Sequence, residues 1–407
     1  MRALLVVLVT AAFIAAQSGG AAFTLPPPTG PLHVATTRWV ITDPDRREPF
    51  EPGEPRRVEV VAWYPTDATS GTPAPYLREG QQSVRSFARA FGNVDLFNDL
   101  VNVRTHAILD AAPAARPARL PLLLFSHGYT SVPAASTALL EDLASHGYVV
   151  LSVIHPYESS ASTIADGRLV TMTDDAGKLR QPIQDVLSEW RREDAIMGEV
   201  TAAPDRAAQL QRLRDYLAGL THTREALKRW VDDIRAAIAQ WPAVKTGPAS
   251  ALRGRVNLER FGVFGHSMGG VSSAEYCLGE HRCAAILNLD GIPQYGSMID
   301  QRLGRPLLMM YSSRPGRVGA SDAIYERTAQ PYYKVVADNT LHLDFTDMAF
   351  WPPLRERKII GGAAPDVVTA NTRVVVQEFF DQELLGRRSP ILSGRRQLPG
   401  ITVVKLP

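Results

Sequence analysis

Several features that mark specialised classes of protein are scarce in this chain of 407 residues. Two cysteines, Cys277 and Cys283, are too few for a cysteine-rich zinc module or a small domain held by disulfides. The net charge is only +2, which excludes the concentrated basic surface typical of nucleic-acid binding. There are no internal repeats and no glycine fingerprint for a dinucleotide, and we expect neither cofactor nor metal. With 45% hydrophobic and 21% charged residues, the chain is an ordinary globular protein, and we expect an enzyme.

Long hydrophobic runs are also missing, apart from one at the N-terminus. Residues 3–16 carry no charge, follow Arg2 and lead into small residues at 18–22. This pattern predicts a secretory signal peptide over residues 1–22 and export to the periplasm or the medium. The run is short of the about 20 apolar residues that span a bilayer, although an uncleaved anchor is the alternative. In an oxidising compartment Cys277 and Cys283 could form a disulfide, with two buried free thiols as the equal alternative.

From about residue 120 the chain alternates between short apolar runs and helical segments, and residues 23–407 read as one domain. Such alternation predicts a mostly parallel sheet with helices on both faces. We expect a helix over 134–146 and strands at 38–42, 58–64, 122–125, 148–154, 260–264, 284–290, 306–311 and 332–337.

A helical insertion, at about 178–247, interrupts this alternation. Its second half places apolar residues at helical spacing, from Leu227 to Trp241, and Pro242 ends that helix. An earlier leucine stripe begins at Leu210. The second helix is expected to pack on the sheet, and the first could do the same or form part of a lid.

The chemistry centres on Ser267 in the sequence Gly-His-Ser-Met-Gly. This Gly-x-Ser-x-Gly motif directly follows a predicted strand and precedes a helix rich in small residues. In that setting the motif is typical of the α/β-hydrolase fold, in which a sharp turn presents a nucleophilic serine. The sequence therefore predicts that fold, with the insertion placed before the nucleophile strand.

Serine needs a base and an acid, which follow it in this fold in the order serine, acid, histidine. Only His281 and His342 come after Ser267, and His281 precedes every plausible acid. His342 follows the strand at 332–337 and is the predicted base. Asp290 stands at the end of the strand at 284–290 and is the predicted acid, because the next strand ends in Ser312-Ser313.

An oxyanion hole requires two backbone N–H groups directed at the developing charge. Met268, directly after the nucleophile, supplies one. The loop Ser-His-Gly-Tyr-Thr that follows the strand at 122–125 should supply the other, and we assign it to Tyr129. His127 in that loop precedes both the serine and the acid, so we interpret it as a residue that braces the loop, and His266 as buried beside the turn.

These residues resemble the plasma-type platelet-activating-factor acetylhydrolases, the lipoprotein-associated phospholipases and their bacterial relatives. The resemblance runs through Trp-Tyr-Pro at 63–65, Phe-Ser-His-Gly at 125–128, Asp-Leu-Ala-Ser-His-Gly-Tyr at 142–148, the serine motif and Leu-Asp at 289–290. It implies the triad Ser267, Asp290 and His342, oxyanion donors at Tyr129 and Met268, and metal-free hydrolysis of short acyl esters, including phospholipids. A lipid substrate would bring transient contact with a membrane surface, and we expect no obligate protein partner.

Two departures from that family shape the alternatives. Tyr129 and Met268 stand where Leu and Phe are expected in the phospholipases, and this pair looks like that of bacterial cutinases and polyester hydrolases. Those enzymes place the acid after the later strand, so the position of Asp290 favours the acetylhydrolase-like branch. The alternatives are a polyester hydrolase, a lipase or an acyltransferase, and, from another class, an inactive binding protein on a hydrolase scaffold.

Overall fold

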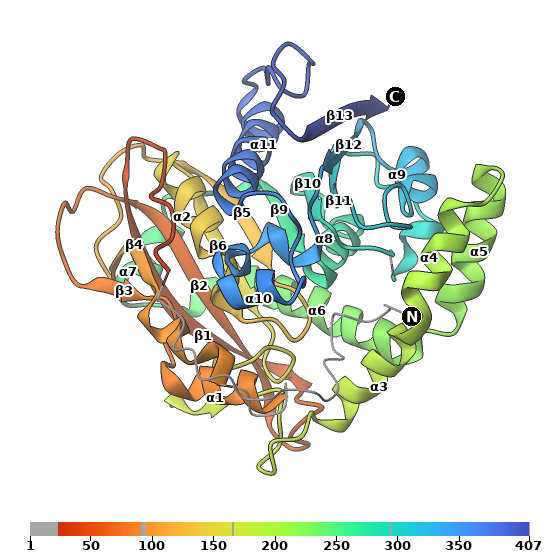
Figure 1. The fold of residues 1–407 in the computed structure, drawn as a ribbon. Coiled ribbons are helices and arrows are strands. Elements are labelled where there is room, and N and C mark those ends of the chain that lie inside the picture. The colour runs from red at the N-terminus through yellow and green to blue at the C-terminus, as the bar shows by residue number, and fades with distance from the viewer. Residues whose placement is uncertain (1–22, 91–94, 165–166, 294, 407) are drawn as a thin grey trace.

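The computed structural model describes residues 23–406, except 91–94, 165–166 and 294. The signal peptide expected over 1–22 lies outside the described residues. The described chain is built around an eleven-stranded sheet with the order β13-β12-β11-β10-β9-β5-β6-β2-β1-β4-β3 (Figure 1). Its centre is parallel, and the strands that border this centre, β2 and β13, join it antiparallel, so the predicted α/β-hydrolase architecture is confirmed.

Six parallel strands form the centre of the sheet, and each corresponds to a predicted apolar run. They are β5 (Leu120–Ser126), β6 (Val149–Ile154), β9 (Val256–His266), β10 (Cys283–Leu289), β11 (Leu307–Ser312) and β12 (Tyr332–Ala337). Their hydrophobic runs are nearly continuous because helices cover both faces, so side chains that point either way are buried. In β5, for example, Leu122 and Leu124 join the core on one face, while Leu123 and Phe125 join the core on the other.

The flanks add strands of both directions. They are β1 (His33–Arg47), β2 (Pro55–Thr66), β3 (Pro73–Pro75) and β4 (Arg104–Leu109) at one side, and β13 (Ile401–Leu406) at the other. The sequence predicted the central parts of β1 and β2 but missed β3, β4 and β13. The segment between β2 and β5 also contains α1 (Gln81–Ala90).

Helices cover the two faces as separate layers. On one face α8 (Met268–Leu278) packs on β9 and β10, and α6 (Thr221–Ala239) packs on α8 and β2. On the other face lie α2 (Thr137–Ser145) and α11 (Pro365–Leu385), the long helix at the top of Figure 1. The predicted helix over 134–146 is α2 preceded by a short 3₁₀ turn at Pro133–Ser136. None of the helices in the described part of the chain is long and apolar enough to span a bilayer.

The insertion is packed into the protein along its whole length. It contains α3 (Gln181–Glu189), α4 (Glu193–Thr201), α5 (Arg206–Ala218) and α6, and α7 (Gly247–Arg253) follows it. In α6 the apolar stripe from Leu227 to Ile238 is buried, as predicted for a helix on the sheet. In α5 the leucine stripe belongs to the same core, with Leu213 fully buried. Burial of both stripes ties the insertion to the domain.

A disulfide and the hydrogen bonds of an N-terminal segment add further links within the domain. Cys277 and Cys283 form a disulfide, with Cα atoms 5.5 Å apart, between the end of α8 and the start of β10. The proline-rich segment at 25–31, here called the leader, runs beside α2 and α11. Arg373 of α11 donates hydrogen bonds to the carbonyls of Pro26 and Pro27, both at 2.9 Å. The backbone N–H of Thr29 donates to Asp142 of α2 at 2.7 Å.

Candidate active site

Ser267 occupies a strained turn between β9 and α8. Its φ of 57° and ψ of −128° lie in a region that non-glycine residues rarely adopt, and such strain is concentrated at functional sites. The flanking glycines make the turn possible: a Cβ on Gly269 would lie 2.0 Å from the carbonyl oxygen of Ser126, and one on Gly265 would lie 2.3 Å from the backbone of Gly269. The motif is therefore required by close backbone packing, and it leaves Ser267 partly exposed.

Asp290 and His342, which the sequence placed at two other strand ends, are in direct contact. His342 lies in a 3₁₀ turn after β12, and its Nδ1 is 2.7 Å from Oδ2 of Asp290. Ser312 at the end of β11 holds the carboxylate from the other side, through its N–H to Oδ1 at 2.7 Å and its hydroxyl to Oδ2 at 3.0 Å. Asp290 is fully buried and the His342 side chain is 12% exposed. The imidazole is thus oriented with one edge left accessible.

The carboxyl group of Asp290 is held in its ionised form. Burial alone would raise its pKa, but the hydrogen bond and charge of His342, the charge of Arg314 and the N–H of Ser312 outweigh it and lower the pKa to about 2. Because the pKa in the unfolded chain is about 4, this carboxylate stabilises the fold above that pH and loses its effect as the pH falls through 2. Asp290 can therefore accept a hydrogen bond from the Nδ1–H of His342 throughout the neutral range.

Hydrogen bonds to backbone carbonyls hold the serine turn next to Asp290 and His342. The N–H of Ser267 donates to the carbonyl of Leu289, the residue before Asp290, at 2.8 Å. His266 is buried, as predicted, and its Nε2 lies 2.9 Å from the carbonyl oxygen of His342. Burial and the charge of His342 lower the pKa of His266 to about 3, so its ring is neutral and donates this bond. The three predicted residues therefore share one edge of the sheet.

The two predicted oxyanion donors also lie at this edge. Met268 is the first residue of α8, where backbone N–H groups have no partner within the helix. Tyr129 follows Gly128, whose position is so close to the nucleophile that a Cβ there would lie 3.4 Å from Cβ of Ser267. Among the described residues, no acceptor takes the N–H of Tyr129 or that of Met268. Both amides are thus available for a ligand atom.

The insertion contributes aromatic and charged residues that sequence reasoning did not assign. Trp190, after α3, packs between Tyr129 and Tyr295, with ring centroids at 5.4 and 5.7 Å. Arg317, in the loop after β11, pairs with Glu193 and Asp194 of α4. No sequence pattern marks these contacts, because they join segments that lie 61 to 124 residues apart in the chain.

Acidic side chains near the base are buried as well. Asp344 and Asp347 follow His342 closely in the chain, a position compatible with solvated carboxylates or with groups that support the base. The structure excludes solvation: Asp344 accepts hydrogen bonds from the N–H groups of Leu341 and Gly361, at 2.7 and 2.6 Å, and so braces the turn that carries His342. In the part of the chain that the structure describes, no group of three or more His, Cys, Asp or Glu side chains is arranged to hold a metal ion.

Comparisons with known proteins agree with this architecture. Residues 63–362 match the family model described as platelet-activating factor acetylhydrolase, isoform II. Among solved structures, the chain is similar to a ferulic acid esterase from Streptomyces cinnamoneus, with a TM-score of 0.69 and 26% sequence identity. The match covers 94% of this chain and 100% of that one. No curated protein matches the chain.

Proposed function

Because the chain belongs to the isoform II family of platelet-activating factor acetylhydrolases, we propose that Ser267, His342 and Asp290 hydrolyse carboxylic esters through an acyl-enzyme. The family and the similar ferulic acid esterase make the protein a hydrolase of the esterase type. The observation that carries the proposed triad is the 2.7 Å contact between His342 and Asp290 at the sheet edge where Ser267 stands in its strained turn.

In the proposed mechanism, Nε2 of His342 takes the hydroxyl proton as Oγ of Ser267 attacks the ester carbonyl. The N–H groups of Tyr129 and Met268 bind the resulting oxyanion. The imidazolium, stabilised by Asp290, then gives its proton to the leaving alcohol, and the acyl group remains on Ser267. Water repeats the sequence: it loses a proton to His342, attacks the acyl-enzyme, and releases the acid and the free serine.

We further propose that the acyl group is short, and that phospholipids with a short acyl chain are among the substrates. The support is the aromatic cluster of Tyr129, Trp190 and Tyr295, which is nearly fully buried and fills the space beside the oxyanion loop. Trp190 is fixed there by a 3.0 Å hydrogen bond from its indole N–H to Thr223. A rigid wall of this kind restricts long acyl chains.

The acyl preference can be measured with p-nitrophenyl esters from acetyl to dodecanoyl. We expect kcat/KM to fall by at least tenfold from butanoyl to dodecanoyl, and Trp190→Ala to flatten this profile because it removes the wall. Lys228→Ala, on the exposed face of α6, is the matched control. A wild-type preference for dodecanoyl esters would exclude the short-acyl proposal and indicate a lipase.

A second candidate substrate is suggested by the ferulic acid esterase, whose name states its substrate acid. An aromatic wall can stack on a phenolic acyl group as well as exclude an alkyl chain. Parallel assays with methyl ferulate and with a short-acyl phospholipid distinguish the two. A kcat/KM for methyl ferulate above that for the acetyl ester would favour the phenolic substrate.

We also propose that the protein is exported and works in the periplasm or outside the cell. The disulfide between Cys277 and Cys283 supports this, because disulfides persist in oxidising compartments. Mass spectrometry of the protein from its native host should show a chain without residues 1–22 and without free thiols. Full-length protein with two free thiols in the cytoplasmic fraction would contradict export.

A further inference from the structure

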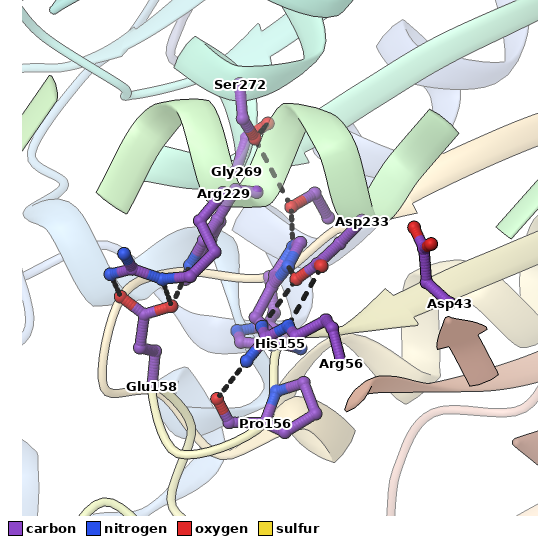
Figure 2. Close-up of polar contacts among 12 residues, drawn as sticks. Asp43, Arg56, His155, Pro156, Glu158, Arg229, Asp233, Gly269 and Ser272 are labelled. Atoms are coloured by element: carbon purple, nitrogen blue, oxygen red, sulfur yellow. Dashed lines mark hydrogen bonds and ion pairs between the residues drawn. The ribbon is translucent and has the colours of Figure 1, made fainter. Parts of the chain in front are cut away.

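A buried network of polar side chains lies behind the oxyanion loop and is not used by the proposed mechanism. Nδ1 of His155 is 2.9 Å from Oδ2 of Asp233, and its Nε2 is 2.9 Å from Oγ of Ser126. Figure 2 shows Arg56 and His155 converging on Asp233, with Arg229 holding Glu158 beside them. The contacts imitate a Ser-His-Asp triad, but all three side chains are fully buried, so no substrate can meet them.

The proton positions in this network follow from its charges. Arg56 donates to both oxygens of Asp233, at 3.1 and 2.6 Å, and Arg46 adds a bond at 2.9 Å, so Asp233 is ionised. Burial lowers the pKa of His155, which is therefore neutral despite its carboxylate partner. Its proton sits on Nδ1 and points to Asp233, and Nε2 accepts the hydroxyl proton of Ser126.

His127, in the oxyanion loop, is linked to this network through the backbone. The N–H of His155 donates to Nε2 of His127 at 3.2 Å, so this nitrogen is the acceptor. The proton of the ring is then on Nδ1, which donates to the carbonyl of Gly128 at 2.7 Å. Burial, together with the neighbouring His155 ring, lowers the pKa of His127 to about 3, so His127 is neutral at neutral pH and keeps this single tautomer.

The bond to Gly128 determines where the N–H of Tyr129 points. The carbonyl of Gly128 and the N–H of Tyr129 belong to one planar trans peptide, so they point in opposite directions. Ser131 holds the same carbonyl through its N–H at 3.1 Å. On the other side, the N–H of Thr130 donates to the carbonyl of Glu158 at 2.8 Å. The Gly128 carbonyl therefore has two donors, and the next peptide of the loop is held at its N–H.

We propose that His127 is a positioning residue, which fixes the Gly128 carbonyl and thereby directs the N–H of Tyr129 at the oxyanion. The role rests on the proposed function, because it acts on the donor of that mechanism. The backbone N–H of His155 sets the required tautomer of His127, and Asp233 of α6 holds the side chain of His155. Through Asp233 the helical insertion thus fixes His155, whose backbone N–H holds His127, without touching the substrate.

The test uses two amides of opposite geometry in the full-length protein. His127→Asn keeps an N–H donor at the position of Nδ1, whereas His127→Gln keeps a polar group only at the position of Nε2. We measure kcat and KM on p-nitrophenyl acetate, the unfolding midpoint, and Ki for a short alkyl trifluoromethyl ketone. Oγ of Ser267 adds to this ketone as His342 takes the serine proton, which leaves an oxyanion in the hole.

We expect His127→Gln to lower kcat by about 10- to 100-fold and to raise Ki for the ketone by a similar factor, with KM within twofold. His127→Asn should stay within about threefold of wild type in all three constants. The role is overturned if Gln leaves kcat and Ki unchanged or if Asn is as impaired as Gln. It is equally overturned if kcat falls in step with the unfolding midpoint while Ki is unchanged.

Failure of this inference can be told apart from failure of the proposed mechanism. If Ser267→Ala abolishes turnover but His127→Gln resembles wild type, only the positioning role is wrong. If Ser267→Ala keeps full activity, the mechanism itself is wrong and the Tyr129 amide has no oxyanion to bind.

Discussion

Replacing Ser267 with alanine is expected to lower kcat for p-nitrophenyl acetate by about 10⁶-fold, or roughly 8 kcal/mol of activation free energy. The serine oxygen forms the acyl-enzyme, and removing it leaves His342 and Asp290 without a nucleophile to activate. Because alanine keeps the Cβ at the strained φ of 57° and the substitution removes only one partly exposed oxygen, the fold should persist. Steady-state kinetics and the unfolding midpoint, measured side by side, check both statements.

Ser188→Ala is the matched control for Ser267→Ala, since Ser188 is an exposed serine in the insertion. A fluorophosphonate probe should label wild type and this control, and leave Ser267→Ala unlabelled. Activity of Ser267→Ala within tenfold of wild type would place the nucleophile elsewhere. Absence of both labelling and turnover in the wild type would favour an inactive binding protein on a hydrolase scaffold.

The second large effect is expected from Asp290→Asn, which should lower kcat by about 10⁴-fold. Ser312 donates its N–H to Oδ1, so the amide oxygen will take that position and the NH₂ group will face His342. An NH₂ group cannot accept a hydrogen bond from the Nδ1–H of His342. The imidazole then carries its proton on Nε2, where it cannot receive the proton of Ser267.

The measurement is kcat as a function of pH for wild type and Asp290→Asn. Because the pKa of Asp290 is lowered to about 2, the acid itself should cause no loss of wild-type activity above pH 4. Asp300→Asn, at an exposed ion pair with Arg214, is the control for an Asp-to-Asn change at the surface. Loss of less than tenfold in Asp290→Asn would mean that another residue orients the base.

Those parts of the site that lie at the ends of apolar strands could be predicted from sequence. A buried parallel strand appears in the sequence as a short hydrophobic run, and this fold places functional residues directly after such runs. For that reason Ser267, Asp290 and His342 were located from chain order alone. The bounds of β12 were predicted to the residue, because Pro331 and Asp338 flank a clear run.

The parts that depend on contacts between distant segments could not be predicted. Asp233 lies in an otherwise ordinary helix, and only its 2.9 Å contact with His155, 78 residues away, gives it a role. The disulfide was left undecided, because spacing alone does not fix the distance between two cysteines. The edge strand β13 was missed since it pairs only with β12 and is half exposed, so it has no continuous apolar run.

The hydrogen bonds of the leader bear on the order in which the segments of the domain fold. The bond from Arg373 to Pro26 joins residues 347 positions apart, and closing so long a loop costs about 5 kcal/mol of chain entropy. Such a contact becomes favourable only once the rest of the domain has folded and has brought the two ends of the loop close together. The leader should therefore dock last, after α11 has been synthesised, and detach first, so that native-state hydrogen exchange would find its amide protons the earliest to be lost.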